Sequence, residues 1–119
     1  MSNYRDLFLW QKAMDLAVEI YKLTEQLPDR EAYGLINQMR RAAISIPSNI
    51  AEGKGSGSDK VFGHFLSIAQ GSRTELETQL EICLRVNYFK EEQITKAMEL
   101  SSEVGKMITI MLKNLRADS

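Results

Sequence analysis

The sequence predicts an all-α protein built as an antiparallel, up-down-up-down bundle of four helices. Its 119 residues contain only two prolines, Pro28 and Pro47, so long stretches are free of helix breakers. In four successive segments, apolar residues recur at spacings of three and four, the pattern of a helix with one buried face. Four such helices with short links pack most simply as a bundle, and we expect a single domain over residues 1–119.

The first two helices are expected on either side of Pro28. The first should run from about Leu7 to Leu27. Its buried face comprises Trp10, Ala13, Ala17, Ile20, Thr24 and Leu27. The second should begin near Asp29, a plausible N-cap, and end at the glycine-rich run that starts at Gly53. Its apolar face comprises Leu35, Met39, Ala42, Ala43, Ile46 and Ile50. Pro47 lies inside this pattern and should kink the helix, because its ring clashes with the carbonyl four residues back.

The third helix should begin after Ser58, which is a good N-cap, and end near Asn87. Its inner face comprises Phe62, Phe65, Ala69, Ser72, Leu76, Leu80 and Cys83. The fourth helix should run from about Glu91 to Leu115. Its inner face comprises Ile94, Ala97, Val104, Ile108, Met111 and Leu115.

Composition and charge place the chain among ordinary globular proteins. Apolar residues make up 44% and charged residues 26%, and the formal net charge is −1. This balance argues against a strongly basic nucleic-acid binder, although residues 32–74 hold five basic and two acidic residues, a local charge of +3. No apolar run approaches the roughly 20 residues that span a membrane. A secretory leader is also missing, so we expect a cytoplasmic protein.

The residues needed for most enzyme chemistry are too few. His64 is the only histidine and Cys83 the only cysteine, which argues against a zinc site and excludes an internal disulfide. The two residues lie 19 positions apart on one predicted helix, or about 28 Å, and cannot form a dyad within a chain. Cys83 should be part of the core, and His64 should be exposed. The glycine-rich run lacks the spacing of a phosphate-binding loop. We therefore expect no enzyme, metal or cofactor.

The second helix carries an unusual polar stripe beside its apolar face. The stripe comprises Arg41, Ser45, Ser48, Asn49 and Glu52, and the third helix offers Ser72 and Glu75 opposite it. Arg41 or Arg40 could pair with Glu75, and Arg73 with Glu52, because buried charges must be paired. Three interpretations stay open: a structural polar network that fixes the register of the helices, a subunit interface, or direct contact with a ligand or nucleic acid.

The same stretch provides a specific resemblance. The motif QMRRAAISIPSNIAEG at residues 38–53 occurs with WQKA at 10–13, YGL at 33–35, FLSIAQGS at 65–72 and ELET at 75–78. This combination, from about residue 4 to 115, resembles the bacterial four-helix-bundle family encoded in intervening sequences of 23S rRNA genes. The resemblance implies a cytoplasmic homopentamer with RNA binding as its supposed role. The family is similar to the accessory protein of diversity-generating retroelements, a pentameric bundle that associates with nucleic acid and reverse transcriptase.

Two functions compete on this basis. The first is a non-enzymatic homo-oligomeric scaffold that binds structured RNA. Its phosphate contacts would be Arg40, Arg41, Lys54, Lys60 and Arg73. Family members often have arginine where Gly55, Ser56 and Gly57 stand, so this chain should bind phosphate more weakly than they do. The second function is a protein-interaction adaptor without nucleic-acid binding. In either case, subunits would meet through the polar stripe and exposed aromatic residues. These are Tyr4, Tyr21, Tyr88 and Phe89.

Overall fold

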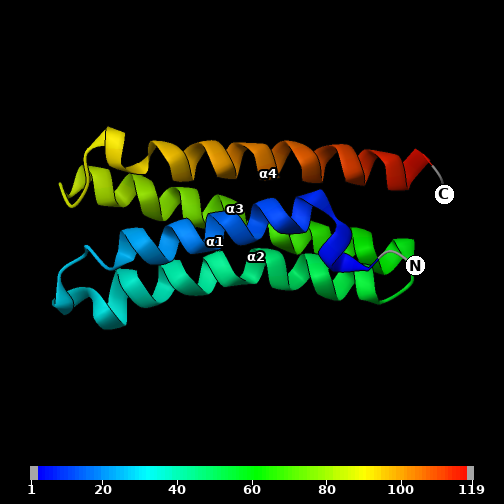
Figure 1. Ribbon diagram of the computed structural model, residues 1–119, viewed down its shortest axis with the longest axis horizontal. Coiled ribbons are helices and arrows are strands. Elements are labelled where there is room, and N and C mark those ends of the chain that lie inside the picture. Colours follow the sequence, from blue (N-terminus) through cyan, green and yellow to red (C-terminus); the bar gives the residue numbers. More distant parts are fainter. Residues whose placement is uncertain (1–2, 118–119) are drawn as a thin grey trace.

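The computed structural model describes residues 3–117, and these residues contain helices and no strand. The four long helices are α1 (Phe8–Thr24), α2 (Asn37–Gly55), α3 (Asp59–Arg85) and α4 (Glu91–Ala117). Three short helical segments, η1 (Tyr4–Asp6), η2 (Asp29–Glu31) and η3 (Ala32–Ile36), precede α1 and α2. The long helices lie side by side in a bundle that measures 46 × 22 × 20 Å (Figure 1). The prediction of an all-α fold with four helices is confirmed.

The four helices enclose one core, because α1 and α3 each pack against both α2 and α4. The α1–α2 and α3–α4 links lie at one end of the molecule, and the α2–α3 link lies at the other (Figure 1). Most of the predicted inner positions are buried. The exceptions, which are only partly buried, are Trp10, Leu35, Phe65, Ser72, Met111 and Leu115. None of the helices within residues 3–117 has a stretch both long and apolar enough to cross a lipid bilayer.

The connection between α1 and α2 differs from the prediction. Helix α1 ends at Thr24, and the continuous α-helix does not resume until Asn37, so Asp29 is not its N-cap. Glu31 provides a cap instead, because its carboxylate accepts a hydrogen bond of 3.3 Å from the backbone N–H of Leu35. A Cβ on Gly34 would lie 2.8 Å from Oε1 of Glu31, so this capping geometry depends on glycine.

The end of α2 also lies later than predicted. The helix continues through Gly53 to Gly55, and the link to α3 is only three residues long. A Cβ on Gly53 would lie 2.8 Å from Cβ of Phe65, so this buried glycine lets α2 and α3 approach closely. Ser58 caps α3 as predicted, because its Oγ accepts a hydrogen bond of 3.2 Å from the N–H of Val61. Pro47 is buried within α2, and a kink there stays a prediction.

Phe89 lies in the core, so its predicted place at an exposed interface is wrong. The cause is the turn after α3, where Asn87 has a φ of 65°. The backbone N–H groups of Tyr88 and Phe89 donate to the carbonyl of Cys83 at 2.9 and 3.3 Å. This geometry folds the chain back over the end of α3 and buries the Phe89 ring. Tyr88 is half-buried, with its hydroxyl 2.7 Å from Oε2 of Glu31.

Candidate functional site

The five basic residues singled out in the sequence lie in four different places. Arg40 joins α2 to α1, with Nε donating to Oγ1 of Thr24 at 2.8 Å and Nη2 donating to the carbonyl of Tyr21 at 3.5 Å. Its guanidinium also lies 4.5 Å from the centroid of the Tyr21 ring. Arg40 therefore connects α2 to α1, and the exposed ring of Tyr21 contacts its guanidinium.

Arg41 is exposed on the α2–α3 side of the bundle. Together with Asn37, Gln38 and Glu75 it lines a small cavity of about 300 Å³. The predicted pairing of Arg41 or Arg40 with Glu75 is not formed, because none of the ion pairs in residues 3–117 joins these side chains. The side chains of both Arg41 and Glu75 are exposed to solvent.

A small polar network between α2 and α3 uses part of the predicted stripe. The Oγ atoms of Ser45 and Ser72 are hydrogen-bonded at 2.8 Å. Nδ2 of Asn49 donates to the carbonyl of Ser45 at 2.7 Å and to its Oγ at 2.8 Å. Ser48 and Glu52 do not join this network and are exposed. The arrangement fits the interpretation in which the stripe fixes the register of α2 on α3.

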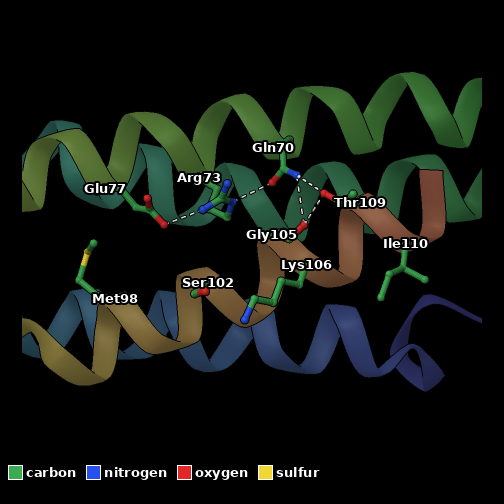
Figure 2. A pocket seen from close by; sticks show the side chains of 9 residues that line it. All are labelled: Gln70, Arg73, Glu77, Met98, Ser102, Gly105, Lys106, Thr109 and Ile110. Atoms are coloured by element: carbon green, nitrogen blue, oxygen red, sulfur yellow. Dashed lines mark hydrogen bonds and ion pairs between the residues drawn. The ribbon is translucent and has the colours of Figure 1, made fainter. Parts of the chain in front are cut away.

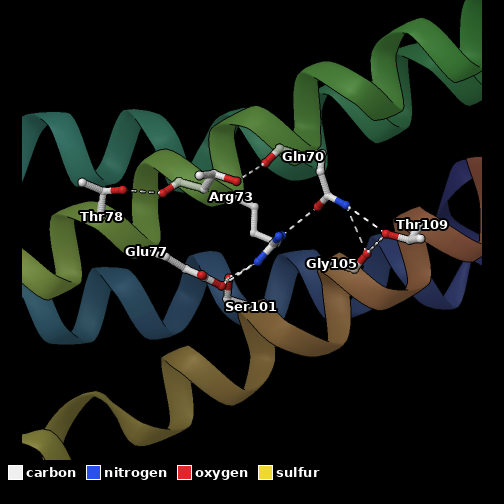
Figure 3. A network of polar contacts seen from close by, with 8 residues as sticks. Gln70, Arg73, Glu77, Thr78, Ser101, Gly105 and Thr109 are labelled. Atoms are coloured by element: carbon white, nitrogen blue, oxygen red, sulfur yellow. Dashed lines mark hydrogen bonds and ion pairs between the residues drawn. The ribbon is translucent and has the colours of Figure 1, made fainter.

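Arg73 lies in a larger network between α3 and α4 (Figure 3). Its Nε donates to Oε1 of Gln70 at 2.7 Å, and its Nη1 lies 2.6 Å from Oε2 of Glu77. The hydroxyl of Ser101 on α4 donates to the same oxygen of Glu77 at 2.5 Å. Arg73 thus pairs with Glu77 rather than with Glu52, and only 17% of its side chain is exposed.

Gly105 makes room for this network on α4. A Cβ at position 105 would lie 2.6 Å from Cζ of Arg73, so the guanidinium lies directly against the helix backbone. Nε2 of Gln70 donates to the carbonyl of Gly105 at 3.2 Å and to Oγ1 of Thr109 at 3.3 Å. Sequence reasoning missed these partners. The signals that could have revealed them are the i, i+4 spacing of Arg73 and Glu77 and an otherwise unexplained glycine within a long helix.

The remaining two basic residues lie at the end of the bundle that holds the α2–α3 link. Lys54 lies 5.9 Å from the centroid of the Phe62 ring. Lys60 lines a cavity of about 520 Å³ together with His64 and Arg116. The carboxyl-terminal turns of α4 reach this same end (Figure 1). Within residues 3–117, Asp59 is the one acidic residue that lines the cavity, beside the two cations Lys60 and Arg116. We call Lys54, Lys60, His64 and Arg116 the basic end.

His64 and Arg116 belong to this group although sequence reasoning assigned them no role. His64 is exposed, as predicted, and lies one helical turn after Lys60 on the same face of α3. That spacing was visible in the sequence. The position of Arg116 follows only from the packing of α4 against α3.

An apolar groove of about 480 Å³ runs between α1 and α2 on the outside of the bundle. Its lining is almost entirely apolar and comprises Trp10, Met14, Ala17, Val18, Tyr21, Ile44, Pro47, Ser48 and Ala51. Val18 is 51% exposed and Ile44 is 44% exposed, although each is a large apolar residue. Within residues 3–117 this surface is therefore apolar and uncovered in the single chain.

The one thiol of the chain, Cys83, lies where it is not reactive. Cys83 is buried with its Sγ 3.8 Å from Sδ of Met39, and burial, with a smaller contribution from the charge of Glu31, raises the pKa of the thiol to about 11. Cys83 is thus a core residue, as predicted. Among the residues that the structure describes, no group of three or more His, Cys, Asp or Glu side chains is placed to hold a metal ion. The absence of enzyme activity and of a cofactor stays a prediction.

Two comparisons with known proteins gave matches. The family model for 23S rRNA-intervening sequence proteins matches residues 5–110. A crystal structure of a protein of unknown function from the S23 ribosomal protein family of Bacteroides thetaiotaomicron is similar, with a TM-score of 0.81 and 28% sequence identity. The similarity covers 88% of this chain and 98% of that one. No match was found among curated protein sequences. The chain belongs to the family of 23S rRNA-intervening sequence proteins.

Proposed function

We propose that this protein is a non-enzymatic, cytoplasmic homopentamer that binds structured RNA associated with 23S rRNA intervening sequences. The observation that supports RNA binding is the basic end, where Lys60 of α3 and Arg116 of α4 line one cavity and Lys54 lies in the last turn of α2 at the same end of the bundle. The family to which the chain belongs links it to 23S rRNA by name. The proposal takes each subunit as an up-down-up-down bundle, in keeping with the alternation of the links in Figure 1, with α2 bent at Pro47.

The basic end suits contact with phosphate groups better than with bases. Lysine and arginine side chains on exposed surfaces neutralise phosphates and supply the largest sequence-independent part of nucleic-acid affinity. Lys54 and Lys60 are the main contacts, and Arg41 adds a third cation farther along α2. Arg40 and Arg73 contribute less, because their guanidinium groups already hold neighbouring helices together.

Self-association would multiply this modest charge. A pentamer carries five basic ends. Once one of them is bound to RNA, the others are held at a high effective concentration, so the overall affinity rises without any new kind of contact. The apolar groove between α1 and α2 supports the oligomer, since an uncovered surface of large apolar side chains is typical of a protein interface.

RNA binding is tested by titration of 23S rRNA fragments at several salt concentrations. We compare the wild type with the double variant K54A/K60A. Loss of two phosphate contacts should lower the slope of log K against log salt by about 1.4–1.8 per subunit that contacts RNA. The matched control is K22A/K90A, which removes two exposed lysines near the opposite end of the bundle and should leave the slope unchanged. Absence of salt-sensitive binding by the wild type at low ionic strength would contradict the proposal.

An adaptor that recognises another protein is the second candidate, and the apolar groove is the observation that favours it. Affinity purification from a bacterial lysate, with and without nuclease, separates the two functions. Nuclease should release the co-purifying material if RNA is the partner. Co-purification of one protein that survives nuclease, together with a wild type that shows no RNA binding, would favour the adaptor.

A further inference from the structure

A second groove, between α3 and α4, has the features of a small-ligand site. Its volume is about 690 Å³, within the usual range for small-molecule pockets. Arg73 and Glu77 lie on the α3 wall, and Ser102 and Lys106 lie on the α4 wall (Figure 2). Apolar side chains complete the lining. Among these are Met98 and Ile110.

The guanidinium of Arg73 is fixed in this groove before any ligand arrives. Its Nε and Nη1 are engaged with Gln70 and Glu77, and its flat face lies against Gly105. Among residues 3–117, Nη2 has no hydrogen-bond partner, so its two N–H groups stay available. A fixed donor with free N–H groups loses little conformational entropy when it binds an anion.

Lys106 supplies a second cation on the opposite wall. Its side chain is exposed and makes no ion pair within the part of the chain that the structure describes. Glu77 is the one acid that lines the groove, and its carboxylate is already neutralised by Arg73 and hydrogen-bonded by Ser101. Because Arg73 and Glu77 together carry no net charge, Lys106 gives the groove its net positive charge, and among residues 3–117 each wall has a donor that makes no ion pair or hydrogen bond.

From this geometry we propose that the groove binds the phosphate group of a small phosphate monoester, of the nucleoside monophosphate class. Nη2 of Arg73 and Nζ of Lys106 would donate to its oxygens, and Ile110, one helical turn after Lys106, would contact its organic part. A carboxylate fits less well, because it is best recognised by two parallel N–H groups of one guanidinium, and two of the three nitrogens of Arg73 are already engaged. A tetrahedral phosphate accepts from donors on two walls.

The site is separate from the basic end, so it does not depend on RNA binding. It is tested by NMR titration of the protein with adenosine monophosphate, with adenosine as the probe that lacks phosphate, at constant ionic strength. We expect saturable shifts of the Arg73 Nε–H and of the backbone amides of Gly105 and Lys106 with the monophosphate and none with adenosine. Equal responses to both probes, or no response to either, would overturn the proposal.

Variants then locate the site. K106A should weaken binding of adenosine monophosphate about tenfold. K113A removes another exposed lysine of α4 outside the groove and should bind as the wild type does. G105A should also weaken binding, because its methyl group displaces the guanidinium, while circular dichroism shows the helices retained. Equal loss in K106A and K113A would indicate diffuse electrostatic attraction and overturn the assignment. The assignment is also overturned if an RNA oligonucleotide without terminal phosphates saturates the same resonances and the monophosphate does not.

Discussion

At the scale of single residues, two glycines in neighbouring helices have opposite roles. A Cβ on Gly53 would lie 2.8 Å from Cβ of Phe65 and 3.2 Å from Cα of Phe62, whereas a Cβ on Gly71 would meet nothing within 4 Å. The first contact involves atoms close to the backbone of α3, which cannot rotate away. The two helices would have to separate to accept a methyl group at position 53.

Unfolding in urea tests this contrast. We expect G53A to lower the free energy of unfolding by about 1–3 kcal/mol, the range for overpacking of a well-packed core. The matched variant G71A should raise it by about 0.5–1 kcal/mol, because alanine has the higher helix propensity at an open position. A neutral G53A would show that α2 and α3 are not in close contact at this point.

Cys83 provides a second test at this scale. Its thiol pKa is raised to about 11, mainly by burial, so almost no thiolate is present at pH 8, and Met39 covers the sulfur. Because the thiolate is the reactive form, a thiol reagent should label the native protein far more slowly than the urea-unfolded protein at this pH. Rapid labelling without denaturant would contradict the buried position of Cys83.

At the scale of elements, the segment from η2 to η3 depends on one carboxylate. Hydrogen bonds from the Tyr88 hydroxyl and then from the backbone N–H of Leu35 lower the pKa of Glu31 below its usual value of 4.5. Desolvation opposes them, and the charge of Arg30 lowers the pKa slightly further. The ionised form is therefore favoured by folding. Its contribution to stability is present above pH 4.5 and is lost as the pH falls through the lowered pKa.

The variant E31Q measures this contribution. It should be less stable than the wild type at pH 7. The difference in free energy of unfolding should shrink as the pH falls below 4.5, because the wild-type carboxylate then becomes protonated and is uncharged, as the glutamine amide is. Y88F removes the largest cause of the shift and should show the same trend with a smaller difference at pH 7. A difference between E31Q and wild type that does not change with pH would mean that the charge of Glu31 has no role in the turn.

The elements also show what the sequence could and could not predict. Helical spacing located the four helices and most of the core, because burial of one face requires it. The predicted start of the second helix, Asp29, lies eight residues before the observed start at Asn37. Asp29 is an acidic residue directly after a proline and so resembles an N-cap. Nothing in the local sequence shows that Glu31 instead caps the backbone N–H of Leu35. The α3–α4 network was missed for a related reason. Ser101 lies 28 residues from Arg73 and meets it only after the helices pack.

At the scale of the whole molecule, polar and apolar contacts have different places. The stripe of α2 was expected to join the helices, to join subunits or to contact a ligand or nucleic acid. Its Ser45 and Asn49 are used within the bundle, together with Ser72 of α3. Four large exposed apolar side chains line the groove between α1 and α2, namely Met14, Val18, Tyr21 and Ile44. We therefore expect the proposed oligomer to form through the apolar groove, whose lining is uncovered in the single chain.

The assignment predicts how charge in the groove changes the size of the particle. I44D places a carboxylate where a neighbouring subunit would cover it, and a buried unpaired charge costs several kcal/mol, so the oligomer should dissociate toward the 13.5 kDa chain. The matched control is I110D, which changes a 60% exposed isoleucine of α4 outside this groove and should keep the wild-type mass. Light scattering coupled to size-exclusion chromatography measures both. A wild type that elutes as a monomer at micromolar concentration would contradict the oligomer itself, whereas dissociation by I110D but not by I44D would move the interface to the α3–α4 side of the bundle.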